Sequence, residues 1–587
     1  MTAADSAEAH DGAYGILFRP GRIGGLELAN RIVMPPMTTR GADDEGFVTE
    51  RSIAYYRARA LGGVGLVTVE MASPERAGRH RFNELGVHDD RFVPGLARLV
   101  EAIHGAGARA SIQLGHGGGH TRVDVCGETP VAPSAVPHPV FERTMETIVP
   151  EAMTEQRIAE CVAAFVAAAL RVRAAGFDAV ELHVAHGYLL SQFLCPAENR
   201  REDAYGGPLA NRARITLDMV RAIKAAAPGF PLIVRMNGDD YFPGGITRDE
   251  ARQVARWVAD AGADAIHVTG GHYRSVPSAA VMIPPMAMGH GPFVELARAI
   301  RADVGVPVIA VGRLGEPGVA AEVLASGAAD FVALGRPLLA DPEWPRRVHA
   351  GRAPRACLGC NTCVDQMRGG SPLGCLVNPT TGREAEYAAR DDRRPRGERI
   401  AVVGAGPAGL SYAALAAADN AVTVFERRAR AGGAFHDVPR TPLFQNVEPR
   451  AYAFEALVDS LERRCREHGA ELRYRTDALR DPRLLAGFDR VVIATGATYR
   501  VGLGPLIRAL LRGGLLTRWP LRSLASRAAV RDWLYHRARR GVEAESVRQL
   551  AGKVKLQIIG DAAAPGRSQA AIESAFRAAY DRTQGLG

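Results

Sequence analysis

Short β-rich apolar runs alternate with helical stretches along the first part of the chain. Eight such runs occur, at residues 31–34, 64–69, 109–114, 179–183, 231–236, 265–268, 307–311 and 331–334. Apolar runs of this length are typical of parallel strands that are buried on both faces. The series predicts an α/β fold that begins with a (β/α)8 TIM barrel, in which the strands close on themselves and the helices lie outside.

Residues with useful chemistry follow the carboxyl ends of nearly all of these runs. They are Met37, Thr38, Glu70, Gln113, His116, His183, His186, Arg235, His272, Gly312, Arg313, Gly335 and Arg336. Barrel enzymes place their active sites at this end of the strands. We therefore expect one active site at the carboxyl face of the barrel.

The last two predicted units each end in the dipeptide Gly-Arg. Gly312-Arg313 follows the seventh run and Gly335-Arg336 the eighth, the two positions where barrels commonly hold a phosphate. Glycine lets a backbone N–H approach the phosphate, and arginine supplies a charged, forked donor. One such pair could be an ordinary turn with a solvated arginine, but two pairs at these positions favour phosphate binding.

Composition narrows the remaining possibilities. The 587 residues suffice for two or three domains, and no apolar run approaches the length of a membrane span. The amino terminus lacks the apolar segment of a signal peptide, so we expect a cytoplasmic protein, in which eight cysteines indicate thiols or metal ligands. Much of the net charge of +9 falls between Arg500 and Arg540, with no basic run interleaved with stacking aromatics, which argues against nucleic-acid binding.

Residues 17–345 resemble the Old Yellow Enzyme family of FMN-dependent oxidoreductases. The similarity rests on an ordered set of segments: NRIVMPPMT at 30–38, QLGH at 113–116, GFDAVELHVAHGYLLSQF at 176–193, NRREDAYGG at 199–207 and NRAR at 211–214. A set of this length and order is highly specific. It implies that residues 1–345 form a catalytic barrel that binds FMN.

By position, the resemblance also implies which residues hold FMN. Pro36, Met37 and Thr38 would line the flavin ring, and Gln113 would hydrogen-bond its pyrimidine edge. Arg235 would lie near N1 and O2, where a fixed cation stabilises the negative charge that hydride arrival at N5 leaves. The phosphate would be held by the residues that the two Gly-Arg pairs indicate independently, Gly312, Arg313, Gly335 and Arg336.

Two histidines and a tyrosine follow the fourth run as HxxHxY. Histidines at this spacing could be zinc ligands, but no third ligand with a suitable spacing lies nearby. In the family, the pair at His183 and His186 hydrogen-bonds a substrate carbonyl or nitro oxygen. Tyr188 matches the proton donor to the α-carbon, although a tyrosine here could also pack under the loop. His272 resembles a second acid in the dienoyl-CoA reductase branch.

Half of the cysteines fall within nineteen residues, as Cys357, Cys360, Cys363 and Cys375. Four closely spaced thiolates predict a metal site, and zinc is one candidate because CxxC is also a zinc spacing. CxxCxxC with one remote cysteine is closer to a 4Fe-4S pattern. The branch with 2,4-dienoyl-CoA reductase and trimethylamine dehydrogenase carries such a cluster here, with one more residue between the second and third cysteines. We assign this segment and its linker to residues 346–395, and expect the other cysteines to be inert.

A strand-to-helix fingerprint begins the third region, residues 396–587. GxGxxG at Gly404, Gly406 and Gly409 follows an apolar run, and Glu426 ends the next run. In this Rossmann arrangement the glycines admit a pyrophosphate and the acid binds a ribose hydroxyl. RVVIATGA at 490–497 and LQIIGDA at 556–562, which contains Asp561, resemble the later strands of flavoproteins with two dinucleotide-binding domains. Together these features favour FAD over NAD.

No second GxGxxG lies between residues 497 and 560, where dienoyl-CoA reductase-like proteins carry an NAD(P)H-binding domain. Instead, Leu506–Arg540 is rich in leucine and arginine and contains Trp519 and Trp533. It could be a shortened remnant, a docking surface for an electron carrier, an amphipathic helix on a membrane surface or a helix that covers the sheet. The electron source stays open, because NAD(P)H could reduce FMN directly or electrons could leave to a protein acceptor.

The sequence predicts an enzyme that reduces an activated carbon–carbon double bond in an enone, enoate or enoyl thioester, with NAD(P)H as co-substrate. The main alternative is a dehydrogenase of amines or other small substrates that passes electrons from FMN through the cluster to a protein partner. Met37 and His183 count against amines, because trimethylamine dehydrogenase has its flavin-linking cysteine and a tyrosine there. A non-catalytic electron-transfer protein would not need His183, His186 and Tyr188. We also expect a homo-oligomer.

Overall fold

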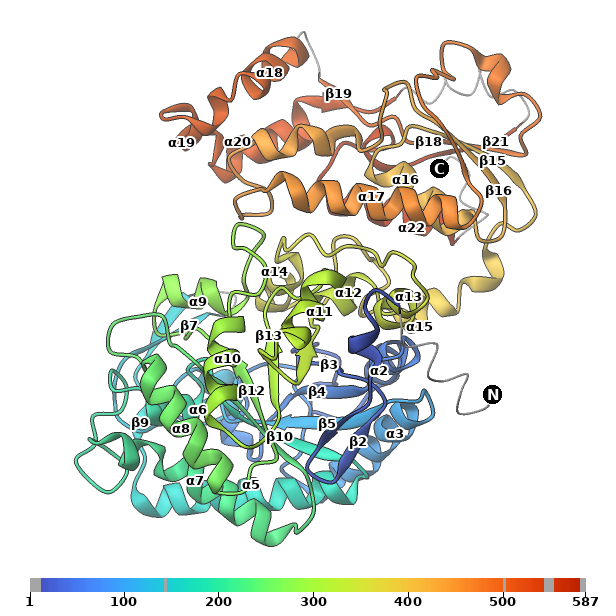
Figure 1. Cartoon of the computed structure of the whole chain (residues 1–587). Helices are drawn as coiled ribbons and strands as arrows, with labels where there is room; N and C mark the ends of the chain where they lie inside the picture. The colour runs from blue at the N-terminus through green and yellow to red at the C-terminus, as the bar shows by residue number, and fades with distance from the viewer. Residues whose placement is uncertain (1–11, 142–144, 500–502, 543–553, 581–587) are drawn as a thin grey trace. The chain divides into compact units, whose positions relative to one another are not determined.

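The computed structural model describes residues 12–141, 145–499, 503–542 and 554–580. The chain forms two compact units (Figure 1). Unit 1 consists of Met1–Arg352 and Cys363–Leu373, and unit 2 of Ala353–Thr362 and Gly374–Gly587.

Unit 1 is built on a closed barrel of eight parallel strands, as the apolar runs predict. In chain order these are β3 (Ile32–Met34), β4 (Leu66–Ala72), β5 (Arg109–Leu114), β10 (Ala179–Val184), β11 (Leu232–Asn237), β12 (Ala265–Thr269), β13 (Val308–Val311) and β14 (Phe331–Ala333). The barrel closes where β14 pairs with β3, with Ala333 opposite Val33. The eight predicted strands are confirmed, with bounds that differ by at most three residues.

Amphipathic helices cover the outside of the barrel (Figure 1). They include α2 (Glu50–Leu61), α3 (Val93–His104), α5 (Glu155–Ala174), α7 (Leu209–Ala226), α8 (Arg248–Asp260), α10 (Val294–Asp303) and α11 (Pro317–Ala325). In α8, a capping box between Thr247 and Glu250 satisfies the first backbone amides. Its buried residues, Ala251, Val254, Ala255 and Val258, recur with the spacing of one helix face.

A hairpin fills the amino end of the barrel with apolar side chains. β1 (Gly21–Ile23) pairs with β2 (Leu26–Leu28), and Ile23, Leu26 and Leu28 share a buried cluster with the first residues of several barrel strands. A Cβ on Gly21 would lie 2.6 Å from the ring of Phe331, so this close approach requires glycine. The amino end is therefore a packed apolar floor.

The loops at the carboxyl end are long and contain short elements of their own. α4 (Val123–Cys126) and the hairpin of β7 (His138–Phe141) with β8 (Met145–Ile148) follow β5. α6 (Leu189–Leu194) follows β10, and α9 (Val276–Met282) follows β12. These loops bring together side chains that lie far apart in the sequence.

Unit 2 contains a five-stranded parallel sheet. Its spatial order is β17 (Glu471–Arg473), β16 (Ala421–Phe425), β15 (Arg399–Val403), β18 (Arg490–Ile493) and β21 (Lys555–Ile558). Helices α16 (Pro407–Ala416), α17 (Ala451–Glu467) and α22 (Ser568–Ala579) accompany the strands. With strands numbered along the chain, this is the order 3-2-1-4-5 of a Rossmann fold, and the predicted Rossmann-like region is confirmed.

Short elements occupy the chain between β18 and β21. They are β19 (Thr498–Tyr499), α18 (Leu503–Arg512), α19 (Leu521–Ala525), α20 (Ala528–Asp532) and β20 (Arg539–Arg540), with a 3-10 turn at Leu515–Thr517 and a π-helical turn at Trp533–Arg537. Within the described part of this stretch, β19 and β20 form a two-stranded antiparallel pair and no second parallel sheet is present. Across the described residues, no helix has both the length and the apolar character needed to cross a bilayer.

Candidate active site

His183, His186 and Tyr188 come together where β10 runs into α6. His186 and Gly187 have positive φ angles of 66° and 83°, so the chain turns back sharply after the strand. A Cβ on Gly187 would lie 2.6 Å from the ring of His272, so this turn needs glycine. The ring centroids of His183 and His186 are 5.1 Å apart, and those of His183 and Tyr188 are 4.9 Å apart.

Both histidines are held in the neutral form. Burial, and then the charge of Arg235, lowers the pKa of His186 well below its usual range. Burial, the neighbouring His186 and Arg235 do the same to the pKa of His183. The Ala185 N–H donates to His183 Nδ1 at 3.2 Å, which places the ring proton on Nε2. His186 Nε2 lies 3.1 Å from Thr269 Oγ1 at the end of β12, which fixes that ring.

Tyr188 lies in a buried group of aromatic and imidazole rings from four loops. Its ring centroid is 5.1 Å from that of His80, 5.7 Å from that of His120 and 5.6 Å from that of Tyr273. Burial and the neighbouring Tyr273 raise the pKa of Tyr188 well above its usual value. The Tyr188 phenol therefore keeps its proton at neutral pH.

Tyr273 has the opposite electrostatic environment. Burial alone would raise its pKa, but the charges of Arg368 and Arg81 outweigh burial and lower it. The guanidinium carbon of Arg368 lies 5.5 Å from the centroid of the Tyr273 ring, and the His120 ring stacks on that ring at 3.8 Å. A hydrogen bond also joins the side chains of Tyr273 and Tyr188. Sequence reasoning missed His80, His120 and Tyr273, because each comes from a different loop and none forms a spaced motif.

The expected flavin-contacting residues Gln113 and Arg235 are buried and lie on β5 and β11, the two strands that flank β10. Gln113 Nε2 donates to Glu181 Oε1 at 2.7 Å, and Glu181 Oε2 pairs with His267 Nδ1 at 2.9 Å. In the strand register, Arg235 lies opposite both His183 and His267. Among the described residues, no hydrogen-bond partner is found for the buried Arg235 Nε. The Arg235 guanidinium, whose Nε has no partner in the described chain, and the Gln113 amide, fixed by Glu181, are suited to bind the polar edge of a flavin.

The segment after β3 packs against the end of β14. A Cβ on Gly335 would lie 3.0 Å from the sulfur of Met37, so the two strand ends approach closely. Beside the expected Pro36, Met37 and Thr38, the backbone N–H of Thr39 donates to Glu70 Oε2 at 2.7 Å, and its hydroxyl donates to Glu70 Oε1. Burial raises the pKa of Glu70 to about 7. Glu70, at the end of β4, thus holds the strand end that would lie against a flavin.

The two Gly-Arg pairs form tight turns at the ends of β13 and β14. Gly312 has a φ of 111°, and a Cβ there would lie 2.8 Å from the Phe293 ring. Arg313 follows with a φ of 53°. Gly335 precedes the short helix α12 (Arg336–Ala340). Gly312 needs glycine for its positive φ, the Met37 sulfur closely approaches Gly335, and each glycine is followed by an arginine. This arrangement fits a phosphate cradle.

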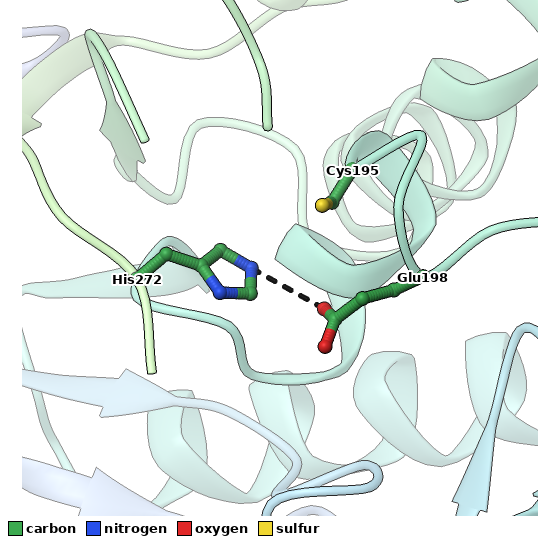
Figure 2. Close-up of side chains that lie close together, drawn as sticks. All are labelled: Cys195, Glu198 and His272. Atoms are coloured by element: carbon green, nitrogen blue, oxygen red, sulfur yellow. Dashed lines mark ion pairs between the residues drawn. The ribbon is translucent and has the colours of Figure 1, made fainter. Parts of the chain in front are cut away.

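His272 belongs to a second buried cluster, with Cys195 and Glu198 (Figure 2). His272 Nε2 pairs with Glu198 Oε2 at 3.3 Å, and the other oxygen of Glu198 pairs with His138 Nδ1. The sulfur, oxygen and nitrogen lie within 4.8 Å of one another. However, the Arg274 N–H donates to His272 Nδ1 at 3.0 Å, so the ring proton occupies Nε2 and that nitrogen cannot ligate a metal. The cluster fixes the loop that carries Tyr273.

The four closely spaced cysteines are not assigned to any disulfide. Cys357, Cys360 and Cys375 belong to unit 2, and Cys363 belongs to unit 1. The Gly359 N–H donates to Cys357 Sγ at 3.4 Å, and Cys360 Sγ lies 3.3 Å from Thr362 Oγ1. A backbone N–H that donates to a cysteine sulfur, as at Cys357, fits the chemistry of a metal-thiolate site.

In unit 2, the glycine fingerprint forms the turn between β15 and α16. Gly404 has a φ of 108°, and a Cβ on Gly409 would lie 1.9 Å from the Gly404 carbonyl oxygen. Gly406 precedes the first residue of α16. Glu426 does not point freely outward, because its Oε2 accepts from the Ala405 N–H at 2.9 Å. Asp561 accepts from Arg539 at 2.7 Å and from the Gly566 N–H at 3.1 Å.

Comparison with known proteins gives two family matches and several relatives that align over most of the chain. Residues 16–355 match the NADH:flavin oxidoreductase / NADH oxidase family, and residues 402–457 match NAD(P)-binding Rossmann-like domains. The chain is 40% identical over 492 residues to a metal reductase of Desulforamulus reducens, an alignment that covers 82% of this chain and 70% of the relative. It is 31% identical over 514 residues to a cinnamate reductase of Clostridium sporogenes, over 83% of this chain and 75% of the relative.

Among solved structures, histamine dehydrogenase from Rhizobium sp. 4-9 is similar over 98% of each chain. The sequence identity is 25% and the TM-score is 0.80. The order of barrel and Rossmann-like region described above is therefore shared with a solved protein over nearly the whole length.

Proposed function

The chain belongs to the NADH:flavin oxidoreductase / NADH oxidase family, and on this premise we propose that it reduces an activated carbon–carbon double bond. The coarser class, a flavin-dependent oxidoreductase, follows from the family itself. One observation carries the finer proposal: a neutral imidazole with its proton on Nε2 lies 4.9 Å, ring to ring, from a phenol that keeps its proton. Alkene reduction needs both, because the carbonyl must be polarised and the α-carbon protonated.

FMN would be held by the groups already described. Gln113 and Arg235 would bind the polar edge of its ring, Pro36, Met37 and Thr38 would line it, and the phosphate would lie at Gly312, Arg313, Gly335 and Arg336. Bound FMN supplies hydride at N5, and NAD(P)H is the proposed source of that hydride. The buried charge of Arg235, which Glu181 balances in part, favours the anionic form of the reduced ring.

The two histidines orient and polarise the substrate. His183 would donate its Nε2 proton to the carbonyl, carboxylate or thioester oxygen. His186, fixed through Thr269, leaves its other ring nitrogen for a second contact. Because both rings are neutral, they place hydrogen-bond donors on the substrate oxygen without a competing positive charge on the reacting alkene.

Tyr188 would deliver the proton to the α-carbon, and Tyr273 would stabilise the phenolate that remains. In the resting pair Tyr188 donates to Tyr273, because their hydrogen bond raises the pKa of Tyr188 and lowers that of Tyr273. Once Tyr188 has given up its proton, Tyr273, the more acidic of the two, can donate its own proton to the Tyr188 oxygen. Arg368, over the Tyr273 ring, favours the arrangement in which the negative charge is shared. His272 stays a predicted second acid, although its Nε2 proton points to Glu198.

The proposal is tested by anaerobic titration of the purified flavoprotein. NADH or NADPH should bleach the flavin, and cinnamate, cyclohexenone or an enoyl thioester should restore its colour with one equivalent of saturated product. In Tyr188→Phe the flavin should be reduced at the wild-type rate, but its reoxidation by the alkene should be about 10²- to 10⁴-fold slower, the range for loss of a general acid. Bleaching that no unsaturated acceptor reverses would contradict the proposal.

Oxidation of an amine is the second candidate, and the likeness to histamine dehydrogenase over nearly the full chain favours it. In that direction the substrate would reduce FMN, and electrons would leave to a protein acceptor. Neutral His183 and His186 offer no negative charge to an ammonium group, which argues for the alkene. Bleaching by histamine or a methylamine, with none by NADH or NADPH, would favour the amine instead.

The remaining cofactors follow from sequence spacing and fold class. We propose that Cys357, Cys360, Cys363 and Cys375 ligate a 4Fe-4S cluster in the segment 346–395. We also propose that residues 396–587 bind FAD at Gly404, Gly406 and Gly409. Glu426, which already accepts from the fingerprint loop, would order that loop while contacting the ribose, and Asp561 would lie at the end of the later strand. Iron and acid-labile sulfide analysis with flavin chromatography tests both assignments.

A further inference from the structure

The segment Leu506–Arg540, here called the arginine segment, carries almost the whole net charge of the chain. It contains nine arginines and one aspartate, a formal charge of +8 out of the total of +9. Its only acid, Asp532, is paired with Arg567 at 2.6 Å. Arg531 and Arg539 bind Asn446 and Asp561 and hold the segment to the rest of unit 2. Within the described side chains, exposed positive charges remain at Arg512, Arg518, Arg522, Arg527 and Arg537.

The same segment exposes an unusual share of large apolar side chains. Half of the twelve exposed large apolar residues in the described chain lie in it: Leu506, Leu515, Trp519, Leu521, Leu524 and Trp533. Trp519 is 85% exposed. Isolated exposed leucines are ordinary, but tryptophan and leucine gathered within twenty-eight residues indicate a contact surface.

Exposed arginines are interspersed with these apolar side chains. Arg512, Arg518, Arg522, Arg527 and Arg537 are exposed, and their side chains form no ion pair with a described residue. Figure 1 shows α18, α19 and α20, which carry much of this surface, at one end of unit 2. The surface thus combines free positive charge with exposed tryptophan and leucine.

We propose that the arginine segment binds an anionic lipid surface and lies in its interfacial layer without spanning it. Exposed tryptophan and leucine combined with many arginines and few acids is the composition of interfacial segments. Tryptophan is favoured at the level of the headgroups, and each arginine near an anionic leaflet adds attraction. An acidic protein also complements the charge, but leucine is under-represented among the residues that dominate protein interfaces.

The test measures flotation of the flavoprotein with lipid vesicles. One set of vesicles is phosphatidylcholine alone, and the other contains about 30% phosphatidylglycerol to supply an anionic surface. We expect binding to the anionic vesicles and loss of binding at about 1 M salt, where charges are screened within about 3 Å. Arg518→Gln/Arg522→Gln should weaken binding about 25-fold, about fivefold for each arginine. Trp519→Ser should weaken binding to anionic vesicles at each salt concentration at which the wild type binds.

The matched control is Arg480→Gln/Arg483→Gln. These two arginines of unit 2 are 89% and 90% exposed but lie outside the arginine segment. This variant should bind vesicles as the wild type does, and all variants should keep the wild-type flavin content and thermal midpoint. Absence of flotation with anionic vesicles, or equal loss in the control, overturns the proposal. A soluble acidic partner as the occupant would give that first result.

Discussion

The Tyr273→Phe substitution removes the hydroxyl group that forms a hydrogen bond with Tyr188, the proposed proton donor. In Tyr273→Phe, Tyr188 keeps its place beside His183, but its oxygen loses a donor at the moment it becomes negative. A hydrogen bond to a charged group contributes about 1.5–3 kcal/mol, so we expect flavin reoxidation by an enone to slow about 10- to 150-fold. The phenyl ring still packs against His120, which keeps the fold intact.

Stopped-flow absorbance separates the two half-reactions. Reduction by NADH takes no proton from Tyr188, so its rate should be unchanged in Tyr273→Phe, as should reoxidation by molecular oxygen. Tyr205→Phe, which removes a hydroxyl from a partly buried tyrosine beside Phe193, is the matched control and should leave both half-reactions intact. Because the two tyrosines act on one proton, the Tyr188→Phe/Tyr273→Phe double variant should be no slower than Tyr188→Phe.

The pH profile adds a readout that a packing role would not change. A general acid fails as pH rises through its pKa, and the hydrogen-bonded pair first loses a proton where its lower pKa lies. That pKa belongs to Tyr273, lowered by Arg368, whereas burial holds the pKa of Tyr188 far higher. The alkaline fall in enone reduction should therefore move to higher pH in Tyr273→Phe. Additive losses in the double variant, or an unchanged alkaline limb, would refute this reasoning.

Three further predictions follow. Glu70 has a pKa of about 7 in the folded protein and 4.5 as an ordinary carboxyl. Ionisation of this buried group therefore costs no folding stability below about pH 4.5 but lowers the free energy of unfolding by roughly 3 kcal/mol at pH 7. The thermal midpoint of Glu70→Gln, relative to that of the wild type, should rise between pH 5 and 7.5. Gly409→Ala places a Cβ 1.9 Å from the Gly404 oxygen and should abolish FAD binding while FMN stays stoichiometric by chromatography; retained FAD would be contrary. Arg235→Met should bind FMN weakly and slow flavin reduction by NADH about 10²-fold or more, measured by stopped flow.

The barrel could be predicted from sequence because its strands are buried on both faces. Near-continuous apolar runs such as VIAV in β13 and FVA in β14 are typical of such strands. The predicted and observed bounds differ most at β4, where the strand continues past the predicted end through Glu70 to Ala72. A buried carboxylate inside a strand interrupts the apolar pattern, and its partners Thr39 and Tyr56 come from other elements.

The site was predictable only where its residues share a motif. His183, His186 and Tyr188 stand within one turn, so spacing and resemblance identify them together. Tyr273 gains its role from Tyr188, 85 positions earlier, and from Arg368 beyond the last barrel strand. No pattern of apolar and polar positions encodes such a contact, because it depends on how separate loops fold over the same strand ends.

His272 and Tyr273 show how neighbouring residues can exchange expected roles. Both could donate a proton, and the resemblance favours the histidine. The Arg274 N–H donates to Nδ1 of His272, and Nε2 pairs with the Glu198 carboxylate, so both ring nitrogens face groups inside the protein. The backbone then directs Tyr273 to the other side, where it meets Tyr188. Glu198→Gln weakens the ion pair with His272, which fixes the loop that carries Tyr273. We therefore expect this variant to shift the alkaline limb of the pH profile of alkene reduction, and an unchanged limb would show that the position of Tyr273 does not depend on the ion pair.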